Sequence, residues 1–243
     1  MYKQSEIYYI SQEKLKDKTY FENIICLNKD NSYYWSDDWS CEFYIDLAKA
    51  GFISTTYDTK EGLVLLPELQ FDYSILDFKD LHISKKVKKL LSSKNYNFSI
   101  NTRFSEVLEK ISTQHKYNWL KDQYLELLKK LHTSKENNNF QIISVEVVSK
   151  DSNELISGKV GYIIGSTYTR LSGFSSKEKK YNNYGNLQLV LLVNFLEKNA
   201  FKFWNLGDTH MPYKRKLGCK IYEKNVFLKR WNEESNSTII NPS

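Results

Sequence analysis

The chain has 243 residues, 41% hydrophobic and 26% charged, a composition typical of a globular protein with a sizeable core. No apolar run is long enough to span a bilayer, and the first residues lack the apolar core of a signal peptide. Cys26, Cys41 and Cys219 have neither Cys-x-x-Cys nor metal-ligand spacing, which indicates reduced thiols. We therefore expect a cytoplasmic protein with no metal, no cofactor and no membrane partner.

The net charge of +6 indicates an anionic partner only in part, because some of the positive charge reflects codon usage. Lysine, asparagine, tyrosine and isoleucine are abundant while proline and glycine are scarce, as in chains encoded by AT-rich DNA. The remaining signal is clustering, and the clustered cations that we expect to bind nucleic acid are Lys85, Lys86, Lys88, Lys89, Lys179, Lys180, Lys214 and Arg215. Any one cluster alone is ordinarily a solvated surface, but together they favour a phosphate-bearing partner.

The N-terminal part predicts one helix and two strands, at Glu42–Ala50, Phe52–Thr55 and Leu63–Leu66. Gly51 is suited to end the helix, and Pro67 is expected to end the second strand. A boundary near residue 80 divides the chain into a small N-terminal subdomain, 1–80, and a larger domain, 81–243.

The larger domain begins with a helix that Ser84 is suited to cap and that carries the first lysine cluster. A strand at Tyr96–Ile100 and a helix at Phe104–Ile111 are expected next. Leucines and a tyrosine at helical spacing between Leu120 and Leu131 then predict an amphipathic helix.

A meander of three strands, a buried helix and one more strand follow, at Phe140–Val148, Glu154–Ile164, Ser166–Leu171, Gly185–Asn199 and Lys202–Leu206. This order of elements is that of the acyltransferase fold called GNAT. The sequence thus predicts an α+β protein, a GNAT-like acyltransferase domain with a small N-terminal subdomain. By itself, this order does not say which group is transferred.

Several motifs are similar, in register, to those of the leucyl/phenylalanyl-tRNA–protein transferases. They are Leu81-His82-Ile83-Ser84, Trp119 before the amphipathic helix, Ser144-Val145-Glu146-Val147, the glycine-punctuated segment from Gly158 to Ser176, and Leu217-Gly218. The resemblance spans roughly residues 42–230. It implies a metal-free GNAT-like domain that moves an amino acid from aminoacyl-tRNA to a protein's N-terminal amine. The segment from Asn205 to Lys214 is more weakly similar to arginyl-tRNA–protein transferases.

The chain departs from the family pattern where the family has its catalytic Asp-x-Gln pair. Asn205 and Gly207 occupy those positions, and Leu171 replaces the glutamate that precedes Met-Phe-Ser in the family. Because Asn205 cannot accept a proton, a base role would move to Asp208 or His210. The catalytic candidates are therefore Asn205, Asp208 and His210.

Glu146 is a candidate for holding the acceptor's ammonium group and basic first side chain, and Ser144 for orienting Glu146. The plainer interpretation of Glu146 is a buried carboxylate paired with a lysine. The remaining substrate-binding candidates are Trp119, Tyr168, Phe174, Ser175 and Trp204. Aromatic residues in such positions are equally what a core contains.

Three functions stay open. The first is transfer of a Leu- or Phe-like amino acid from charged tRNA to an N-terminal amine, by a monomer that marks proteins for degradation by the N-degron route. The second is acetyl transfer from acyl-CoA, which the absence of Gly-x-Gly between Ser176 and Gly185 disfavours. The third is a lapsed relative that binds tRNA or N-termini without catalysis.

Overall fold

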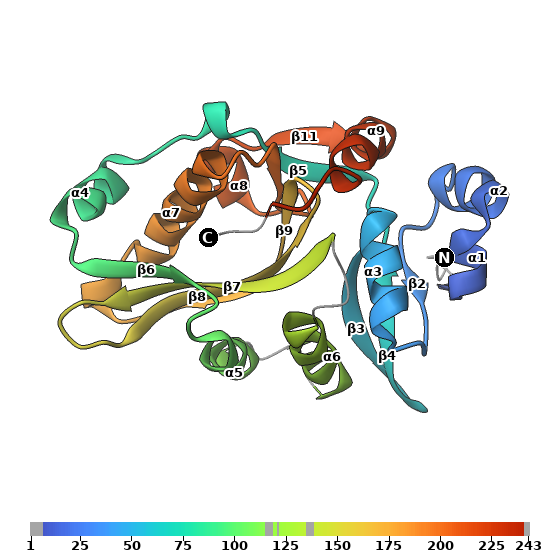
Figure 1. The fold of residues 1–243 in the computed structure, drawn as a ribbon, viewed down its shortest axis with the longest axis horizontal. Helices are drawn as coiled ribbons and strands as arrows, with labels where there is room; N and C mark the ends of the chain where they lie inside the picture. Colours follow the sequence, from blue (N-terminus) through green and yellow to red (C-terminus); the bar gives the residue numbers. More distant parts are fainter. Residues whose placement is uncertain (1–6, 115–118, 121, 135–138, 241–243) are drawn as a thin grey trace, which may run out of the picture.

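The computed structural model describes residues 7–114, 119–120, 122–134 and 139–240. Its centre is a seven-stranded sheet in the order β11-β5-β10-β9-β8-β7-β6 (Figure 1). The strands are β5 (Asp72–Leu76), β6 (Tyr96–Ile100), β7 (Phe140–Ser149), β8 (Leu155–Ile164), β9 (Thr167–Ser175), β10 (Phe203–Asn205) and β11 (Lys220–Glu223). Neighbouring strands are antiparallel except β9 and β10, which run parallel because helix α7 (Tyr184–Lys198) connects them.

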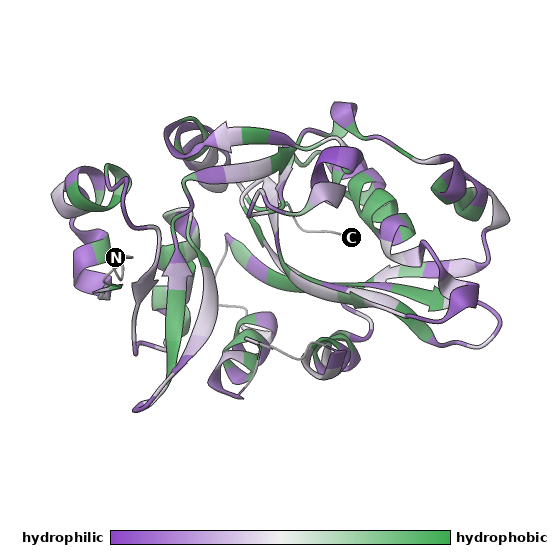
Figure 2. Ribbon diagram, turned by 180° about the vertical axis from the view of Figure 1, so that it is seen from behind, coloured by the Kyte–Doolittle hydropathy of each residue, from purple (hydrophilic) through white to green (hydrophobic). Residues whose placement is uncertain are grey.

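Helices cover both faces of this sheet. Helix α7 lies on one face, and α5 (Phe104–Gln114) and α6 (Asp122–Thr133) lie on the other (Figure 1). Helix α4 (Lys85–Ser93) packs beside α7, and Figure 2 shows α7 as mainly hydrophobic and α4 as mainly hydrophilic. Side chains alternate along β7, so Ile143 and Val145 pack in the core beneath α7 while Ile142 and Val148 pack on the α5 and α6 side.

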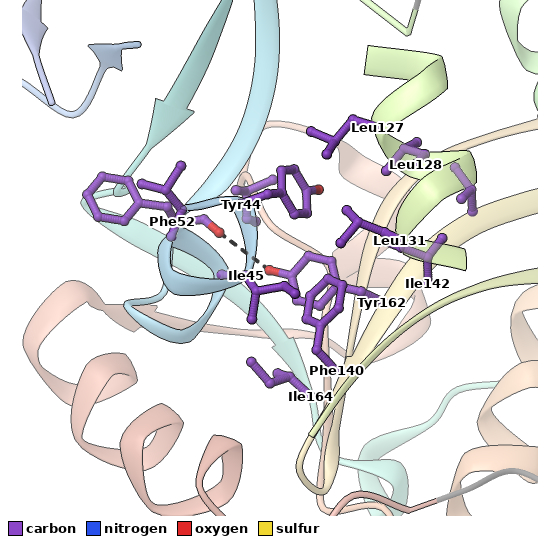
Figure 3. Close-up of a cluster of buried hydrophobic side chains, with 14 of the residues drawn as sticks. Tyr44, Ile45, Phe52, Leu127, Leu128, Leu131, Phe140, Ile142, Tyr162 and Ile164 are labelled. Carbon is purple, nitrogen blue, oxygen red and sulfur yellow. Dashed lines mark hydrogen bonds between the residues drawn. The ribbon is translucent and has the colours of Figure 1, made fainter. Parts of the chain in front are cut away.

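The N-terminal part contains α1 (Gln12–Lys16), α2 (Lys18–Tyr20), a π-helix (Phe21–Cys26), α3 (Cys41–Lys49), the parallel pair β1 (Tyr8–Tyr9) and β2 (Tyr34–Trp35), and the hairpin of β3 (Ile53–Thr59) and β4 (Gly62–Glu68). Its apolar side chains form one cluster with those of α6, β7 and β8 (Figure 3). The Tyr162 hydroxyl donates to the Phe52 carbonyl oxygen at 3.4 Å, and the Tyr44 and Tyr124 hydroxyls lie 2.9 Å apart. The N-terminal part is therefore packed on the same sheet face as α5 and α6.

Most predicted elements are confirmed within a few residues, including the Ser84 cap, whose Oγ accepts from the Val87 amide. One expectation is wrong, because Pro67 lies inside β4, opposite Ser54, and does not end it. The sequence also failed to indicate β5, α8 (Pro212–Leu217), β11 and α9 (Lys224–Ser235). Strand β5 precedes residue 80 but belongs to the main sheet, and the division of the chain near residue 80 stays a prediction.

Strand β9 separates from β10 part of the way along its length. The two strands pair only from Thr167 to Thr169, and the next residues contain a bulge in which Leu171 is extra between the pairs made by Arg170 and Ser172. The rest of β9 has no described strand on that side. Its edge faces the start of α7 instead, where Asn183 has φ +71° and makes no side-chain cap.

Candidate active site

A hollow of about 600 Å³ occupies the place where β9 leaves β10. Its walls come from β8, β9, the segment before α7, the start of α7 and α8, and they include Lys159, Arg170, Phe174, Ser175, Asn186 and Tyr213. A second hollow of about 660 Å³ shares Asn186, Leu189 and Tyr213 with the first and extends to α4, His82 and Arg215. The two hollows therefore adjoin, and we call them together the α7 groove.

The rim of the α7 groove is basic. Exposed Lys177 and Lys179 line one end, and exposed Arg215 and Lys216 line the other. The lysines of α4 are exposed next to the second hollow, where Ser84 and Val87 of the same segment form the wall. Such a rim suits the phosphates of a nucleic acid.

Lys159 lies on the floor of the groove and is only 5% exposed. Its Nζ donates to Gln188 Oε1 at 2.5 Å. Gln188 Nε2 donates to the carbonyl oxygens of Val145 and Ser157, which fixes Oε1 as the atom that faces the lysine. Burial, and to a lesser degree the nearby charge of Arg170, hold the pKa of Lys159 well below its usual value.

Arg170 is the second cation inside the groove. Its Nη1 donates to the Tyr213 hydroxyl, the guanidinium lies 5.8 Å from the centre of the Tyr213 ring, and its buried Nε has no hydrogen-bond partner in the described part of the chain. Among the described residues, neither Arg170 nor Lys159 has a carboxylate within 4.0 Å. We call Arg170 and Lys159 the cation pair.

Some of the residues predicted from sequence meet at this groove. Phe174, Ser175 and Lys179 line its first hollow, and Arg215 lines the second. Tyr168 and Trp204 are fully buried in the core beneath α7, with ring centres 5.7 Å apart. The Tyr168 hydroxyl and Trp204 Nε1 have no hydrogen-bond partner among the residues that the structure describes, but neither residue lines the groove. Lys180 is exposed and pairs with Glu178 at 3.1 Å.

Glu146 and Ser144 lie on the opposite face of the sheet from the α7 groove, and their expected role as substrate contacts stays a prediction. Both are fully buried, and the Ser144 hydroxyl donates to Glu146 Oε1 at 2.5 Å. The Ser99 hydroxyl and the amides of Thr102 and Arg103, just before α5, donate to the same carboxylate. The hollow of about 400 Å³ over this segment is lined by Thr102 and Arg103 but not by Glu146. The Glu146 carboxylate therefore anchors the start of α5.

The catalytic candidates lie at the end of β10 and in the segment after it, outside the lining of the groove. Asn205 is buried, its Oδ1 accepts from the Gly207 amide, and its Nδ2 has no partner. Asp208 Oδ2 accepts from Lys214 Nζ at 2.7 Å. Burial opposes the ionised form of Asp208, but the hydrogen bond and charge of Lys214 outweigh it and lower the pKa of that carboxyl. This pairing disfavours Asp208 as a base at neutral pH.

Three further candidates lie away from the groove, and their roles stay predictions. The Lys214 side chain is 2% exposed in its pair with Asp208, unlike the exposed cations of the rim. His210 is exposed, and its amide donates to Asp208 Oδ1 in a local turn. Trp119 packs edge-on against Tyr124 at 5.4 Å, on the α6 side, and its carbonyl oxygen accepts from Thr56. None of these three residues lines either hollow of the α7 groove.

Within the described ranges, no three His, Cys, Asp or Glu side chains are placed to share a metal ion. In the same part of the chain, no helix has the length and apolar composition needed to cross a membrane. The groove offers amide, hydroxyl, amine and guanidinium groups and the carboxylate of exposed Glu178. Groups of these kinds can bind and orient substrates and move protons.

An antiparallel meander, a crossover helix and a strand that separates from its parallel neighbour define a GNAT-like acyltransferase fold, here with a basic groove at the separation. The model of the family described as leucyl/phenylalanyl-tRNA protein transferase matches residues 75–232. The chain belongs to this family, and it is an aminoacyltransferase.

The relatives include the leucyl/phenylalanyl-tRNA–protein transferase of Flavobacterium johnsoniae, 23% identical over 158 residues that cover 63% of this chain and 69% of that protein. Among solved structures, FemX is 12% identical, with a TM-score of 0.48, and the match covers 80% of this chain and 70% of that one. A GCN5-related N-acetyltransferase from Kribbella flavida is 9% identical, with a TM-score of 0.41 and coverages of 77% and 63%. These two likenesses in shape carry no functional argument.

Proposed function

We propose that the α7 groove holds the 3′ end of an aminoacyl-tRNA and that the chain transfers the amino acid to the N-terminal α-amine of an acceptor protein. The observation that carries this proposal is the family match over residues 75–232, a range that includes every residue that lines the groove. Leucine and phenylalanine are the donor amino acids that the family name supplies. The N-degron role, the cytoplasmic location and the monomeric state belong to the same proposal.

The chemistry makes modest demands on the protein. The ester of an aminoacyl-tRNA is already activated, and an α-amine with a pKa of about 8 is roughly one-tenth neutral at pH 7. The neutral amine attacks the ester carbonyl carbon, the bond from that carbon to the ribose oxygen breaks, and a proton from the amine reaches the ribose oxygen. Catalysis therefore rests on positioning and on a route for one proton.

The groove contains a suitable proton donor. The Tyr213 hydroxyl accepts a hydrogen bond from Arg170 and lines both hollows. Burial raises the pKa of Tyr213, so its hydroxyl stays protonated at neutral pH. In this proposal Tyr213 gives its proton to the departing ribose oxygen and is reprotonated from the amine, while the exposed rim cations bind the tRNA phosphates.

A transfer assay with a panel of radiolabelled aminoacyl-tRNAs and peptides with different first residues tests the proposal. We expect label to move to peptides that have a free N-terminal amine and not to the same peptides after N-acetylation. Acetyl-CoA is included as the competing donor. Transfer of acetyl groups alone, or no transfer from any charged tRNA, would contradict the proposal.

A further inference from the structure

The cation pair is an unusual arrangement for the floor of a pocket. Arg170 and Lys159 line the same hollow, and after burial the charge of Arg170 contributes to the low pKa of Lys159. Protonation of Lys159 beside a second cation in a low-dielectric site is unfavourable in the empty protein, where the described residues place no carboxylate within 4.0 Å of either cation. An anionic ligand would remove that cost.

The cation pair has few hydrogen-bond partners. Among the described residues, Lys159 Nζ donates to Gln188 Oε1 and Arg170 Nη1 donates to the Tyr213 hydroxyl, while the buried Arg170 Nε has no partner. Asn183, Gly185 and Asn186, at the uncapped start of the 15-residue helix α7, line the same hollow. The amides at a helix N-terminus favour negative charge as well.

We propose that the cation pair binds a carboxylate carried by one of the two substrates of the transferase, so that this chain selects an acidic amino acid. The proposal rests on the aminoacyl-transfer function given above and specifies its substrate class. The carboxylate belongs either to the transferred amino acid or to the first side chain of the acceptor.

Depth favours a carboxylate over a phosphate of the tRNA. A phosphodiester continues in two directions and needs an open path, which the exposed cations at the rim provide. Lys159, at 5% exposure, is reached only by a group at the end of a side chain. The floor and the rim thus suit two different anions.

Binding of a carboxylate also changes the protonation of Lys159. A bound negative charge raises the pKa of the amine toward its usual value, so binding is coupled to proton uptake at pH values between the lowered and the raised pKa. The other charged or titratable groups that line the same hollow are Arg170 of β9, Tyr213 of α8, and Lys177, Glu178, Lys179 and Tyr181 of the segment before α7. The proton uptake is assigned to Lys159 by comparison with a variant that lacks it.

Binding calorimetry with matched probes tests the proposal without requiring transfer. One pair of probes is a peptide beginning with Glu and the same peptide beginning with Gln. The other pair is the 3′-amide analogues of glutamyl-adenosine and glutaminyl-adenosine. Within one pair we expect the acidic probe to bind at least tenfold more tightly and to take up a proton, seen as a heat that depends on the buffer. The pair that shows the preference identifies the source of the carboxylate.

Variants separate recognition from structure. Lys159→Met should abolish the tenfold preference and the proton uptake, Lys159→Arg should keep most of the preference, and Arg170→Gln should reduce it. The control is Lys202→Met, an exposed lysine before β10, which should change neither quantity. Thermal melts establish that each variant is folded.

Several results would overturn the proposal. They are equal affinity within both pairs, a preference that survives Lys159→Met, an equal loss for acidic and neutral probes, or a Lys159→Met variant that instead weakens uncharged tRNA and lowers its salt dependence. A preference in calorimetry without transfer from any charged tRNA would contradict the proposed function and not the carboxylate site. Transfer from charged tRNA without any preference for acidic probes would contradict the carboxylate site and not the proposed function.

Discussion

The two faces of the central sheet treat buried charge in opposite ways. On the α5 and α6 face, the carboxylate of Glu146 receives hydrogen bonds from two hydroxyls and two backbone amides and is closed to solvent. On the α7 face, one residue away in the strand pairing, Lys159 has a single amide oxygen as its partner and opens to a hollow. A satisfied buried charge indicates structure, whereas an unsatisfied one beside a cavity indicates a ligand.

Removal of the Glu146 carboxylate should give the largest effect on stability. In Glu146→Ala the Ser99 and Ser144 hydroxyls and the Thr102 and Arg103 amides lose their acceptor, and we expect the free energy of unfolding to fall by about 3 kcal/mol. Urea denaturation measures the change. The matched control is Glu106→Ala, which removes a partly exposed carboxylate 3.4 Å from Arg103 and should cost under about 1 kcal/mol. A stable Glu146→Ala variant with altered acceptor selectivity would return Glu146 to the active site.

Replacement of Lys159 should have the opposite sign. Lys159→Met substitutes an apolar chain of similar length for a buried amine, so we expect the variant to be more stable by about 2 kcal/mol at pH 7. Native Lys159 has a lowered pKa, so between that value and the unfolded pKa of about 10.4 the unfolded state binds more protons. Wild-type stability relative to the variant should therefore rise with pH, by up to about 1.4 kcal/mol per pH unit. The expectation would be contradicted by a variant less stable than wild type, or by a difference in unfolding free energy that does not change with pH. Either result would mean that native Lys159 is a charged ammonium whose burial is fully compensated.

The sequence could predict that Glu146 and Lys159 are buried on opposite faces of the sheet, but not which face carries the groove. Alternation along the strands places Glu146 and Lys159 on opposite faces, and their burial was predictable from the apolar residues around them. Which face carries the groove depends on the separation of β9 from β10 and on α8, an element with only six residues. A lone lysine and a lone glutamine in apolar segments were the available signals for Lys159 and Gln188. Tyr213 had no such signal, because it lies next to the basic run Lys214-Arg215-Lys216, which is typical of an exposed surface. In the structure Lys214 is buried.

The rim of the groove should differ from the α6 face in its effect on tRNA. We expect Lys85→Glu with Lys89→Glu to weaken tRNA binding about tenfold and to reduce the slope of log K against log salt by about 1 or 2. The control carries the same change in net charge at Lys60, in the β3–β4 turn, and Lys130, on α6, both of which are exposed. Filter binding over a range of salt concentrations measures both quantities. Equal losses in the two double variants would mean that net charge alone attracts the tRNA.

The smallest effect on stability is expected at Asp208, whose carboxylate is paired with Lys214 but partly exposed. Asp208 holds the buried Lys214, yet the aspartate side chain is 40% exposed and water screens it, so Asp208→Asn should lower stability by only about 1 kcal/mol at pH 7. Because the native pKa of Asp208 is lowered, its contribution is present above the unfolded pKa of about 3.9 and is lost as the pH falls through the native pKa. The melting temperatures of wild type and variant should therefore converge in acid. A loss of transfer with unchanged stability would instead support the base role predicted for Asp208 from the sequence, and would move the proton route from Tyr213 to the segment after β10.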